Sequence, residues 1–283
     1  MIADAFARVA ELPVEHVASF VVEKGTDPTF FGDAGEIFAL ASVTKLFSAF
    51  ACLVAMEEGT IGAEDPAGPP GSTVAHLLSH ASGLSMSDPN SVLAPPATRR
   101  IYSNVGFDVL ADHVAQRAAM TFVEYLDESL FAPLSMRDSS LVGSPASGAH
   151  SSAGDLARFA AELLSSDLLA ASTLEAATTV VFPGLSGVVP GFGHYANCDW
   201  GLGFELKADK SPHWTAPENS PQTFGHFGQA GCFLWVDPAR HLAFGLLGDR
   251  PFGEWAKQAW PVIGSALLAA GKDTDQHHYA SNP

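Results

Sequence analysis

Apolar and polar residues follow two kinds of spacing along the 283-residue chain, which changes from a strand pattern to a helical one and back. Residues 1–12 have the spacing of a short amphipathic helix. Short apolar runs bounded by Gly, Asp and Pro come next, and they predict strands at 17–22, 29–31 and 37–39. The chain therefore begins with one helix and a group of short strands.

The middle of the chain is mainly helical. Residues 42–58 form a long helical pattern, which Gly59 closes at its C-terminus. Residues 62–72 are rich in Gly and Pro and are predicted to be a loop. Helical spacing returns at 76–78, 105–120, 122–130 and 153–164, with Ser152 as the N-cap of the last helix.

Strand patterns return after a Gly- and Pro-rich connection at 182–193, and they cover 202–206, 224–226, 231–236 and 242–247. Residues 237–240 (Asp-Pro-Ala-Arg) predict a turn that joins the last two strands as a hairpin. An amphipathic helix is predicted at 252–269. The polar residues 271–283 are expected to be disordered.

This order of elements predicts an α+β fold. An antiparallel sheet is assembled from both ends of the chain and is flanked by helices, with a helical region inserted between its two parts. We expect a discontinuous sheet domain of residues 1–58 and 175–270, and a helical domain of residues 59–174. A functional site is expected in the cleft between them.

Composition narrows the classes of function. Apolar residues make up 47% of the chain and charged residues 16%, which is typical of a compact globular protein. The formal net charge is -17. Such a charge repels phosphate backbones and anionic lipid headgroups, so neither nucleic acid nor a membrane surface is an expected partner.

The cysteines and the N-terminal residues bear on the cellular compartment. Cys52, Cys198 and Cys232 are too few and too scattered for a disulfide framework. The first residues lack the uninterrupted apolar stretch of a signal peptide, and no apolar run is long enough to span a bilayer. The expected location is cytoplasmic.

The most informative local pattern is Ser42-Val43-Thr44-Lys45. Three residues are close to one helical turn, so the hydroxyl and the amine project from the same face of the predicted helix. A lysine can take the serine proton if its surroundings lower its pKa and populate the neutral amine. The pattern thus supplies a nucleophile and a candidate base, although an exposed Lys on an amphipathic helix would look the same.

Two further segments carry groups suited to acyl transfer. Tyr102-Ser103-Asn104 follows a loop and precedes a helix; the phenol could relay a proton and the amide could hold a substrate carbonyl or amide. Residues 225–231 (Gly-His-Phe-Gly-Gln-Ala-Gly) could bring a backbone N–H next to that of Ser42 as an oxyanion hole. Taken singly, the first is equally consistent with a packed aromatic residue and the second with a glycine-rich hairpin.

In this order, Ser42-x-x-Lys45, Tyr102-x-Asn104 and His226-x-Gly228 resemble the three motifs of the penicillin-recognising serine hydrolases. That superfamily comprises class C β-lactamases, DD-peptidases and related esterases. Residues 77–84 resemble its Leu-Leu-x-His-x-Ser-Gly-Leu segment, 152–159 its Gly-Asp-Leu helix start, and 234–238 its strand end after the third motif. The resemblance spans about residues 20–268 and implies a β-lactamase/transpeptidase-like fold.

The resemblance also implies roles for individual residues. Ser42 is the expected nucleophile, Lys45 its activating partner and Tyr102 the base and then the acid. Asn104 is expected to contact the substrate and Lys45. The second oxyanion N–H falls on Gln229, the residue after Gly228. Whether Lys45 or Tyr102 takes the first proton stays open, because the base of β-lactamase-type enzymes has been disputed.

The third motif departs from the Lys-Thr-Gly that β-lactamases typically carry. Here it reads His226-Phe227-Gly228, so a phenyl ring replaces the hydroxyl that helps to hold the carboxylate of β-lactams and D-Ala-D-Ala peptides. Losing a charge-assisted contact of this kind costs roughly 1.5–3 kcal/mol. We therefore rank a small-molecule ester or neutral amide above a penicillin, with a β-lactamase or DD-peptidase-type carboxypeptidase as the alternative.

Other readings of the sequence are open to test. An α/β-hydrolase would need a Gly-x-Ser-x-Gly elbow, which the sequence lacks. His76 and His80 have the spacing of some zinc ligands, but no third ligand accompanies them, and we expect no metal and no cofactor. A non-catalytic relative that binds a ligand in the same cleft is the main rival, because a fold does not guarantee chemistry. The oligomeric state is not predicted.

Overall fold

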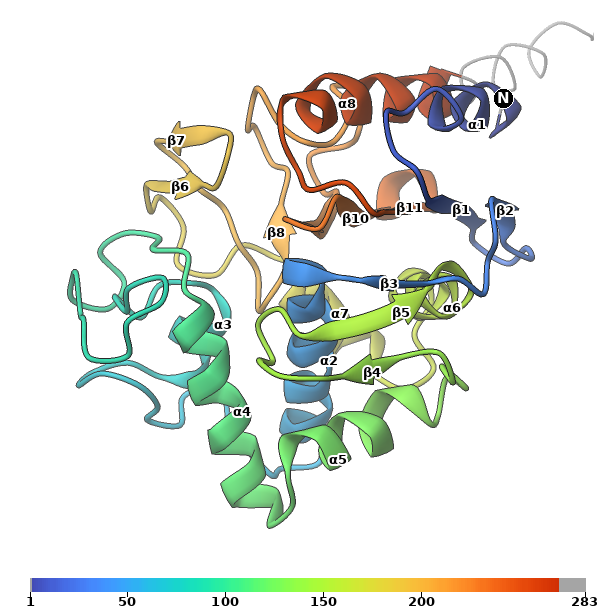
Figure 1. Ribbon diagram of the computed structural model, residues 1–283. Helices are drawn as coiled ribbons and strands as arrows, with labels where there is room; N and C mark the ends of the chain where they lie inside the picture. Colours follow the sequence, from blue (N-terminus) through green and yellow to red (C-terminus); the bar gives the residue numbers. More distant parts are fainter. Residues whose placement is uncertain (1, 270–283) are drawn as a thin grey trace, which may run out of the picture.

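The computed structural model describes residues 2–269, and a six-stranded antiparallel sheet forms its centre (Figure 1). The strands run in the order β2-β1-β11-β10-β9-β8. Their bounds are Val17–Glu23 (β1), Thr29–Phe31 (β2), Glu205–Leu206 (β8), Phe224–Gly228 (β9), Cys232–Asp237 (β10) and Leu242–Gly248 (β11). Strands from both ends of the chain therefore make one sheet, which confirms the predicted α+β fold. The tail predicted at 271–283 lies outside the described residues.

Both faces of this sheet are buried. In β1 the side chain of Phe20 packs into one hydrophobic cluster and that of Val21 into another, as successive strand residues point to opposite faces. Leu234 and Phe233 of β10 divide in the same way. Burial on both faces explains why the strands appear in the sequence as continuous apolar runs without an alternating pattern.

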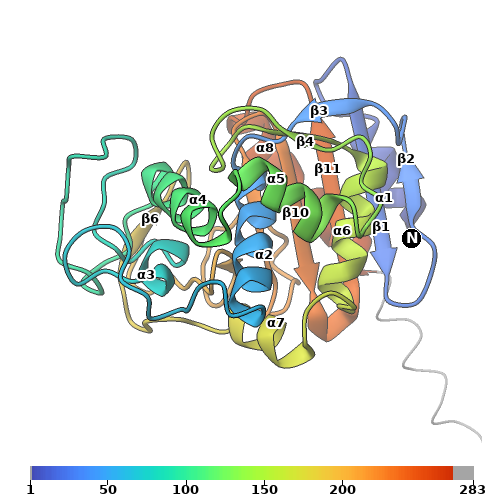
Figure 2. The ribbon, with the colours of Figure 1, turned by 90° about the horizontal axis from the view of Figure 1, so that it is seen from below.

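Helices cover the two faces as separate layers. Helices α1 (Ile2–Val9) and α8 (Glu254–Leu268) pack against each other on one side of the sheet (Figure 1). On the other side lie α2 (Thr44–Glu57) and α6 (Ala153–Leu164), seen in front of the sheet in Figure 2. Ser152 caps α6 as predicted, accepting a hydrogen bond from Asp155 N at 3.2 Å.

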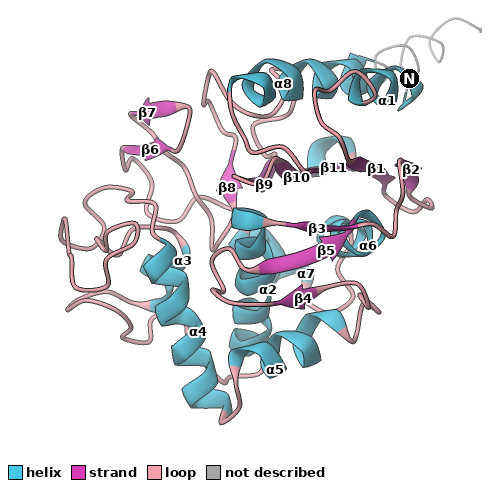
Figure 3. Ribbon diagram, viewed as in Figure 1, coloured by secondary structure: helices cyan, strands magenta, loops and turns pink. Residues whose placement is uncertain are grey.

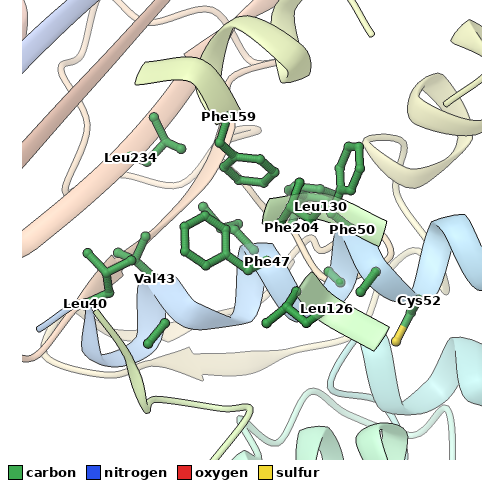
Figure 4. Packing of buried hydrophobic residues seen from close by; sticks show 14 of the residues in the cluster. Leu40, Val43, Phe47, Phe50, Cys52, Leu126, Leu130, Phe159, Phe204 and Leu234 are labelled. Atoms are coloured by element: carbon green, nitrogen blue, oxygen red, sulfur yellow. The ribbon is translucent and has the colours of Figure 1, made fainter. Parts of the chain in front are cut away.

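Helix α2 is buried along most of its length and forms the centre of the larger cluster. Figure 4 shows Phe47 and Phe50 of this helix against Phe159 of α6, near Leu234 of β10. The rings of Phe47 and Phe159 meet edge to face, with 5.0 Å between their centroids. A 3₁₀ turn, η1 (Ala41–Val43), leads into α2. The start of α2 is therefore held rigidly against the sheet.

The remaining elements surround this frame (Figure 3). The helices are α3 (Val74–Leu78), α4 (Asn104–Ala118), α5 (Phe122–Leu126), a π-helical turn η2 (Asp127–Phe131), α7 (Ala171–Ala177) and a 3₁₀ turn η3 (Pro238–Arg240). A small sheet contains β3 (Ile37–Ala39), β5 (Ala149–Ser152) and β4 (Ser140–Leu141), and β6 (Gly187–Val189) pairs with β7 (Gly193–Tyr195).

Two sequence predictions of local structure were wrong. The strand predicted at 202–206 is reduced to Glu205–Leu206, because Gly203 has a left-handed φ of +89° and a side chain there would lie 2.2 Å from Ala49. The connection 182–193 contains β6 and the start of a hairpin. The strand predicted at 37–39 is present as β3, and it pairs with β5 outside the main sheet.

The predicted domain boundaries stay a prediction, although the contacts of α6 bear on them. This helix falls in the sequence range assigned to the helical domain, yet it packs against β1 and β11 of the main sheet. Among residues 2–269 no helix is both long enough and apolar enough to cross a membrane.

Candidate active site

Ser42 lies in the 3₁₀ turn before α2, at the point where the chain leaves the sheet region for the central helix. The preceding residue, Ala41, has a left-handed φ of 43°, a conformation that costs a non-glycine residue free energy. The turn leaves Ser42 partly exposed, whereas Lys45, one turn later, is fully buried. The hydroxyl can therefore meet a substrate while the amine stays shielded from water.

The Lys45 amine has three oxygen neighbours. Its Nζ lies 2.7 Å from Asn104 Oδ1, 2.8 Å from the Ala146 carbonyl oxygen and 3.5 Å from Ser42 Oγ. A neutral amine has two N–H groups and one lone pair. Donation to the amide and carbonyl oxygens, which only accept, would leave the lone pair for the serine hydroxyl.

The surroundings of Lys45 favour that neutral form. Burial lowers the pKa of Lys45 from 10.5 to about 7, and the negative charge of Asp108 opposes this only in part. No carboxylate within residues 2–269 forms an ion pair with the amine; its other close neighbours are the rings of Tyr102 and Phe107. Lys45 is thus poised to accept a proton near neutral pH.

Tyr102 connects Ser42 with His226. The phenol oxygen lies 3.1 Å from His226 Nε2, and the other ring nitrogen, Nδ1, lies 2.6 Å from the Phe227 carbonyl oxygen. Because a carbonyl can only accept, Nδ1 carries the proton and Nε2 accepts from the phenol. Burial raises the pKa of Tyr102 above its ordinary value, a hydrogen bond with Ser42 opposes this, and the Glu205 charge adds to it. The phenol is therefore protonated at neutral pH.

Neighbouring residues hold Tyr102 and Asn104 in place. The ring of His80 lies against that of Tyr102, with centroids 4.6 Å apart, and His80 Nδ1 accepts a hydrogen bond from Ser103 N at 3.1 Å. Ser103 caps α4 by accepting from Gly106 N, and Asn104 N donates to the Met86 carbonyl. The second motif is thus fixed at a helix start.

The third motif brings a second backbone N–H near the nucleophile. A Cβ at Gly228 would lie 2.3 Å from the Leu40 carbonyl oxygen, so only glycine lets β9 approach the turn that carries Ser42 this closely. Gln229 follows at the turn, where its carbonyl accepts from Phe252 N at 2.9 Å. Among residues 2–269, neither Ser42 N nor Gln229 N donates to a protein acceptor. Both N–H groups are available for an oxyanion.

These residues open onto a small pocket, whose empty space is about 350 Å³ when the open solvent at its mouth is included. Five of the residues expected from the sequence line it, namely Ser42, Tyr102, His226, Phe227 and Gln229. Lys45 and Asn104 do not line the pocket; the Lys45 amine lies next to Ser42 Oγ and Asn104 Oδ1. Gly228 packs against the turn that carries Ser42. The structure therefore brings all eight predicted residues together, and it places the nucleophile at a concave surface of the kind that binds small molecules.

Sequence reasoning missed the other half of the pocket wall, which comprises Met86, Val189, Pro190, Trp200 and Glu205. All five lie in loops or short strands with no regular spacing. Glu205 did carry a signal, since it is a lone charge inside the apolar run Gly-Leu-Gly-Phe-Glu-Leu. Buried ionisable residues are found at functional sites more often than elsewhere.

The two histidines weighed as zinc ligands have other partners. His76 Nδ1 lies 2.9 Å from Thr73 Oγ1 at the start of α3, and its ring stacks on Phe182. His80 holds Ser103, as described above. Within residues 2–269 no group of three or more His, Cys, Asp or Glu side chains could hold a metal ion.

Comparison with known proteins gives a family-level match. A sequence profile described as beta-lactamase matches residues 32–268, most of the chain. A crystal structure described as a beta-lactamase from Mycobacterium bovis is 48% identical, with a TM-score of 0.92, covering 94% of this chain and 98% of that one. The penicillin-binding protein homologue from Pyrococcus abyssi shares the fold, with a TM-score of 0.74 at 19% identity over 96% of this chain and 76% of that one.

A curated relative matches a shorter stretch. The D-alanyl-D-alanine-carboxypeptidase/endopeptidase AmpH of Escherichia coli (strain K12) is 24% identical over 191 residues, 46% of this chain and 50% of the relative. The match thus spans about half the length of that protein. Together these likenesses confirm the resemblance to the penicillin-recognising serine hydrolases inferred from the three motifs.

Proposed function

The chain belongs to the β-lactamase family, and on that premise we propose that it hydrolyses a small, uncharged or cationic ester or amide through an acyl-enzyme on Ser42. The observation that carries the proposal is the Lys45 amine, which is buried, close to Ser42 Oγ and held by two acceptors that leave its lone pair free. A binding protein would have no need for a buried lysine whose pKa lies near 7.

Acylation can be followed atom by atom. Neutral Lys45 takes the proton of Ser42 as Oγ bonds to the substrate carbonyl carbon, and the carbonyl electron pair moves to its oxygen. The N–H groups of Ser42 and Gln229 stabilise this oxyanion. When the carbonyl re-forms, the bond to the leaving group breaks and the leaving atom takes the Tyr102 proton. The phenolate then recovers a proton from the Lys45 ammonium, because the pKa of Tyr102 is the higher of the two.

Hydrolysis of the acyl-enzyme repeats these steps with water. Lys45 takes a proton from water as the water oxygen bonds to the acyl carbon, and the same two N–H groups stabilise the oxyanion. Collapse breaks the bond to Ser42 Oγ, which takes the proton back from Lys45. The products are a carboxylic acid and the free hydroxyl, and every group returns to its starting state. In this proposal Lys45 is the base, and its lowered pKa and its place beside Ser42 Oγ support that choice over Tyr102.

The charge of the pocket supports an uncharged or cationic substrate. Among its lining residues within 2–269, Glu205 is the one with a formal charge at neutral pH, since burial lowers the pKa of His226 to about 4. Phe227 turns its ring toward Phe252, with centroids 4.8 Å apart, and offers no hydrogen bond. A substrate carboxylate would find no cation on this wall, so penicillins and peptides with a free carboxylate are disfavoured.

A second candidate function follows from the comparisons. The M. bovis protein is described as a beta-lactamase and the E. coli relative as a carboxypeptidase. A β-lactamase or DD-peptidase activity is therefore the alternative, and the same nucleophile would carry it. The cytoplasmic location and the absence of nucleic-acid and membrane partners stay predictions.

One experiment separates these possibilities. We would follow release of p-nitrophenol from p-nitrophenyl butyrate and, separately, intact protein mass after exposure to a penicillin. Wild type, Ser42→Ala and the control Ser165→Ala, a change at an exposed serine far along the chain, would be compared. Turnover lost only in Ser42→Ala, without a penicilloyl adduct, supports the proposal. A stable adduct on Ser42 favours the alternative, and silence with both reagents favours a binding protein.

A further inference from the structure

Glu205 presents a buried carboxylate to the pocket beside the nucleophile. It lies in β8, opposite Gly225 of β9, and only 1% of its surface is exposed. An isolated carboxylate would be neutral at such a position, because burial raises the pKa of an acid. Here the Lys210 ammonium and the hydrogen bond with His213 outweigh burial and hold the pKa of Glu205 at about 2. The pocket therefore has a permanent negative charge in its wall.

The partners of this carboxylate do not line the pocket themselves. Oε1 lies 3.2 Å from His213 Nε2 and 3.7 Å from Lys210 Nζ, and Oε2 accepts from Trp214 Nε1 at 2.9 Å. None of these three residues is part of the pocket wall. A carboxylate oxygen can accept two hydrogen bonds, and among residues 2–269 Oε2 receives one. Oε2 can therefore accept one further hydrogen bond from a ligand, and the carboxylate can attract a positively charged one.

Aromatic rings make up much of the rest of the wall. Trp200 and Tyr102 lie 6.1 Å apart between centroids, and Trp200 and His226 lie 5.6 Å apart. The face of a Trp ring attracts cations, most strongly where water is excluded, whereas the Tyr102 ring already has Lys45 Nζ 4.7 Å from its centroid. The net charge of -17 adds a long-range attraction for cations and repels anions. The Glu205 carboxylate, the aromatic wall and the net charge of the protein therefore all favour a positively charged ligand.

From this geometry we propose that Glu205 and the surrounding rings are a cation subsite, and that the substrate carries a compact ammonium group next to the bond that is cleaved. The inference rests on the proposed hydrolase function and names its substrate class. The pocket encloses little empty space, which favours a compact cation on a short chain. Glu205 is then a specificity-determining residue.

Esters that differ only in charge test this inference. β-Alanine methyl ester and methyl butyrate share one shape, with an ammonium in place of a methyl group on the acyl side. Butyrylcholine and 3,3-dimethylbutyl butyrate form the matched pair on the alcohol side. We expect wild type to prefer the cationic member of at least one pair roughly tenfold in kcat/KM. Acid release in a pH-stat measures all four.

Variants assign the preference to Glu205. Glu205→Gln should bring the ratio within each pair close to one, whereas Asp209→Asn, the same change at an exposed carboxylate, should leave it unaltered. If Glu205→Gln does not fold because Lys210 loses its partner, the double variant Glu205→Gln/Lys210→Met removes both charges. A preference that survives without Glu205 would overturn its role.

The remaining outcomes distinguish the two proposals. Equal turnover of charged and neutral members by wild type, or a preference for the neutral ones, would overturn the cation subsite and leave the hydrolase function intact. Absence of turnover with all four esters, together with no acyl adduct on Ser42, would overturn both.

Discussion

Lys45 and Lys210 are buried to a similar extent, and the structure uses them in opposite ways. Lys210 Nζ donates to the carbonyl oxygens of Asp199 and Leu206 and faces Glu205 Oε1 at 3.7 Å. Lys45 donates to two neutral oxygens and has no ion-pair partner within residues 2–269. A buried ammonium with a carboxylate partner stays charged and supports the fold, whereas one without such a partner loses its proton readily and can serve as a base.

The largest effect expected from this difference is on catalysis. Lys45→Met removes the base while filling the same apolar surroundings, so kcat for ester hydrolysis should fall roughly 10²–10⁴-fold. The net change in the free energy of unfolding at neutral pH should be small, because removal of an amine whose charged form is disfavoured by burial opposes the loss of its hydrogen bonds to Asn104 Oδ1 and the Ala146 carbonyl. Steady-state kinetics and urea unfolding measure the two quantities. Near-wild-type activity in Lys45→Met would refute the role of the lysine.

Lys210→Met should mainly lower the free energy of unfolding, whereas Lys45→Met mainly lowers kcat. It leaves the Glu205 carboxylate buried without its cation, and breaking a buried pair from one side costs about 3–5 kcal/mol of unfolding free energy. The double variant Lys210→Met/Glu205→Gln should recover much of that loss, since neither charge remains. Urea unfolding of the single and double variants measures the coupling. Equal stability of wild type and Lys210→Met would show that the pair contributes nothing.

Asn104→Asp would give Lys45 a carboxylate partner, as Lys210 has in Glu205. The change preserves shape but places a carboxylate oxygen 2.7 Å from Nζ, and an opposite charge at that range raises a lysine pKa by roughly 1–3 units. Turnover at pH 7 should fall about 10–10³-fold and recover as the pH is raised. Asn104→Ala is the control, because it removes the contact without adding charge. Loss of activity that no increase in pH restores would contradict the explanation.

The sequence predicted the central sheet well for a physical reason. Strands such as β1 and β11 are buried on both faces, so they appear as apolar runs that Gly, Asp and Pro interrupt sharply. β5 and β6 are short and also have partners distant in the chain, since β5 pairs with Ile37–Ala39 and Gly187 of β6 forms a bridge with Arg100. Local patterns have no access to such pairings.

In the candidate site, too, local patterns identify some residues and miss contacts between residues that are distant in the chain. Ser42 and Lys45 are recognisable because a helical turn brings them together, and a shared order of motifs points to Tyr102 and His226. Whether Lys45 has a carboxylate partner depends on contacts 59 and 101 residues away along the chain. The opposite surroundings of Lys45 and Lys210 therefore became apparent only in three dimensions, as did the place of Glu205 in the pocket.

The pH dependence of wild-type kcat/KM tests whether Lys45, unlike Lys210, acts as a neutral base, and the expected effect is smaller than that of the variants. Because the pKa of Lys45 is about 7 and its neutral form is required, kcat/KM should rise about tenfold per pH unit below 7 and level off above it. Burial holds the pKa of His226 at about 4 and raises that of Tyr102, so neither gives a rise near 7. A rise centred near 4 would transfer the role of base to His226.

The free energy of unfolding should also depend on pH through the titration of Lys45. In the unfolded chain the pKa of Lys45 returns to 10.5, so between about 7 and 10.5 the unfolded state binds more protons than the folded one. The contribution of Lys45 to unfolding free energy should thus increase with pH across that window, by at most about 1.4 kcal/mol per unit, and be flat below it. The difference between wild type and Lys45→Met in urea unfolding isolates this contribution from other titrating groups. A difference that does not vary with pH would mean that Lys45 keeps its proton when buried, as an ammonium with a carboxylate partner does.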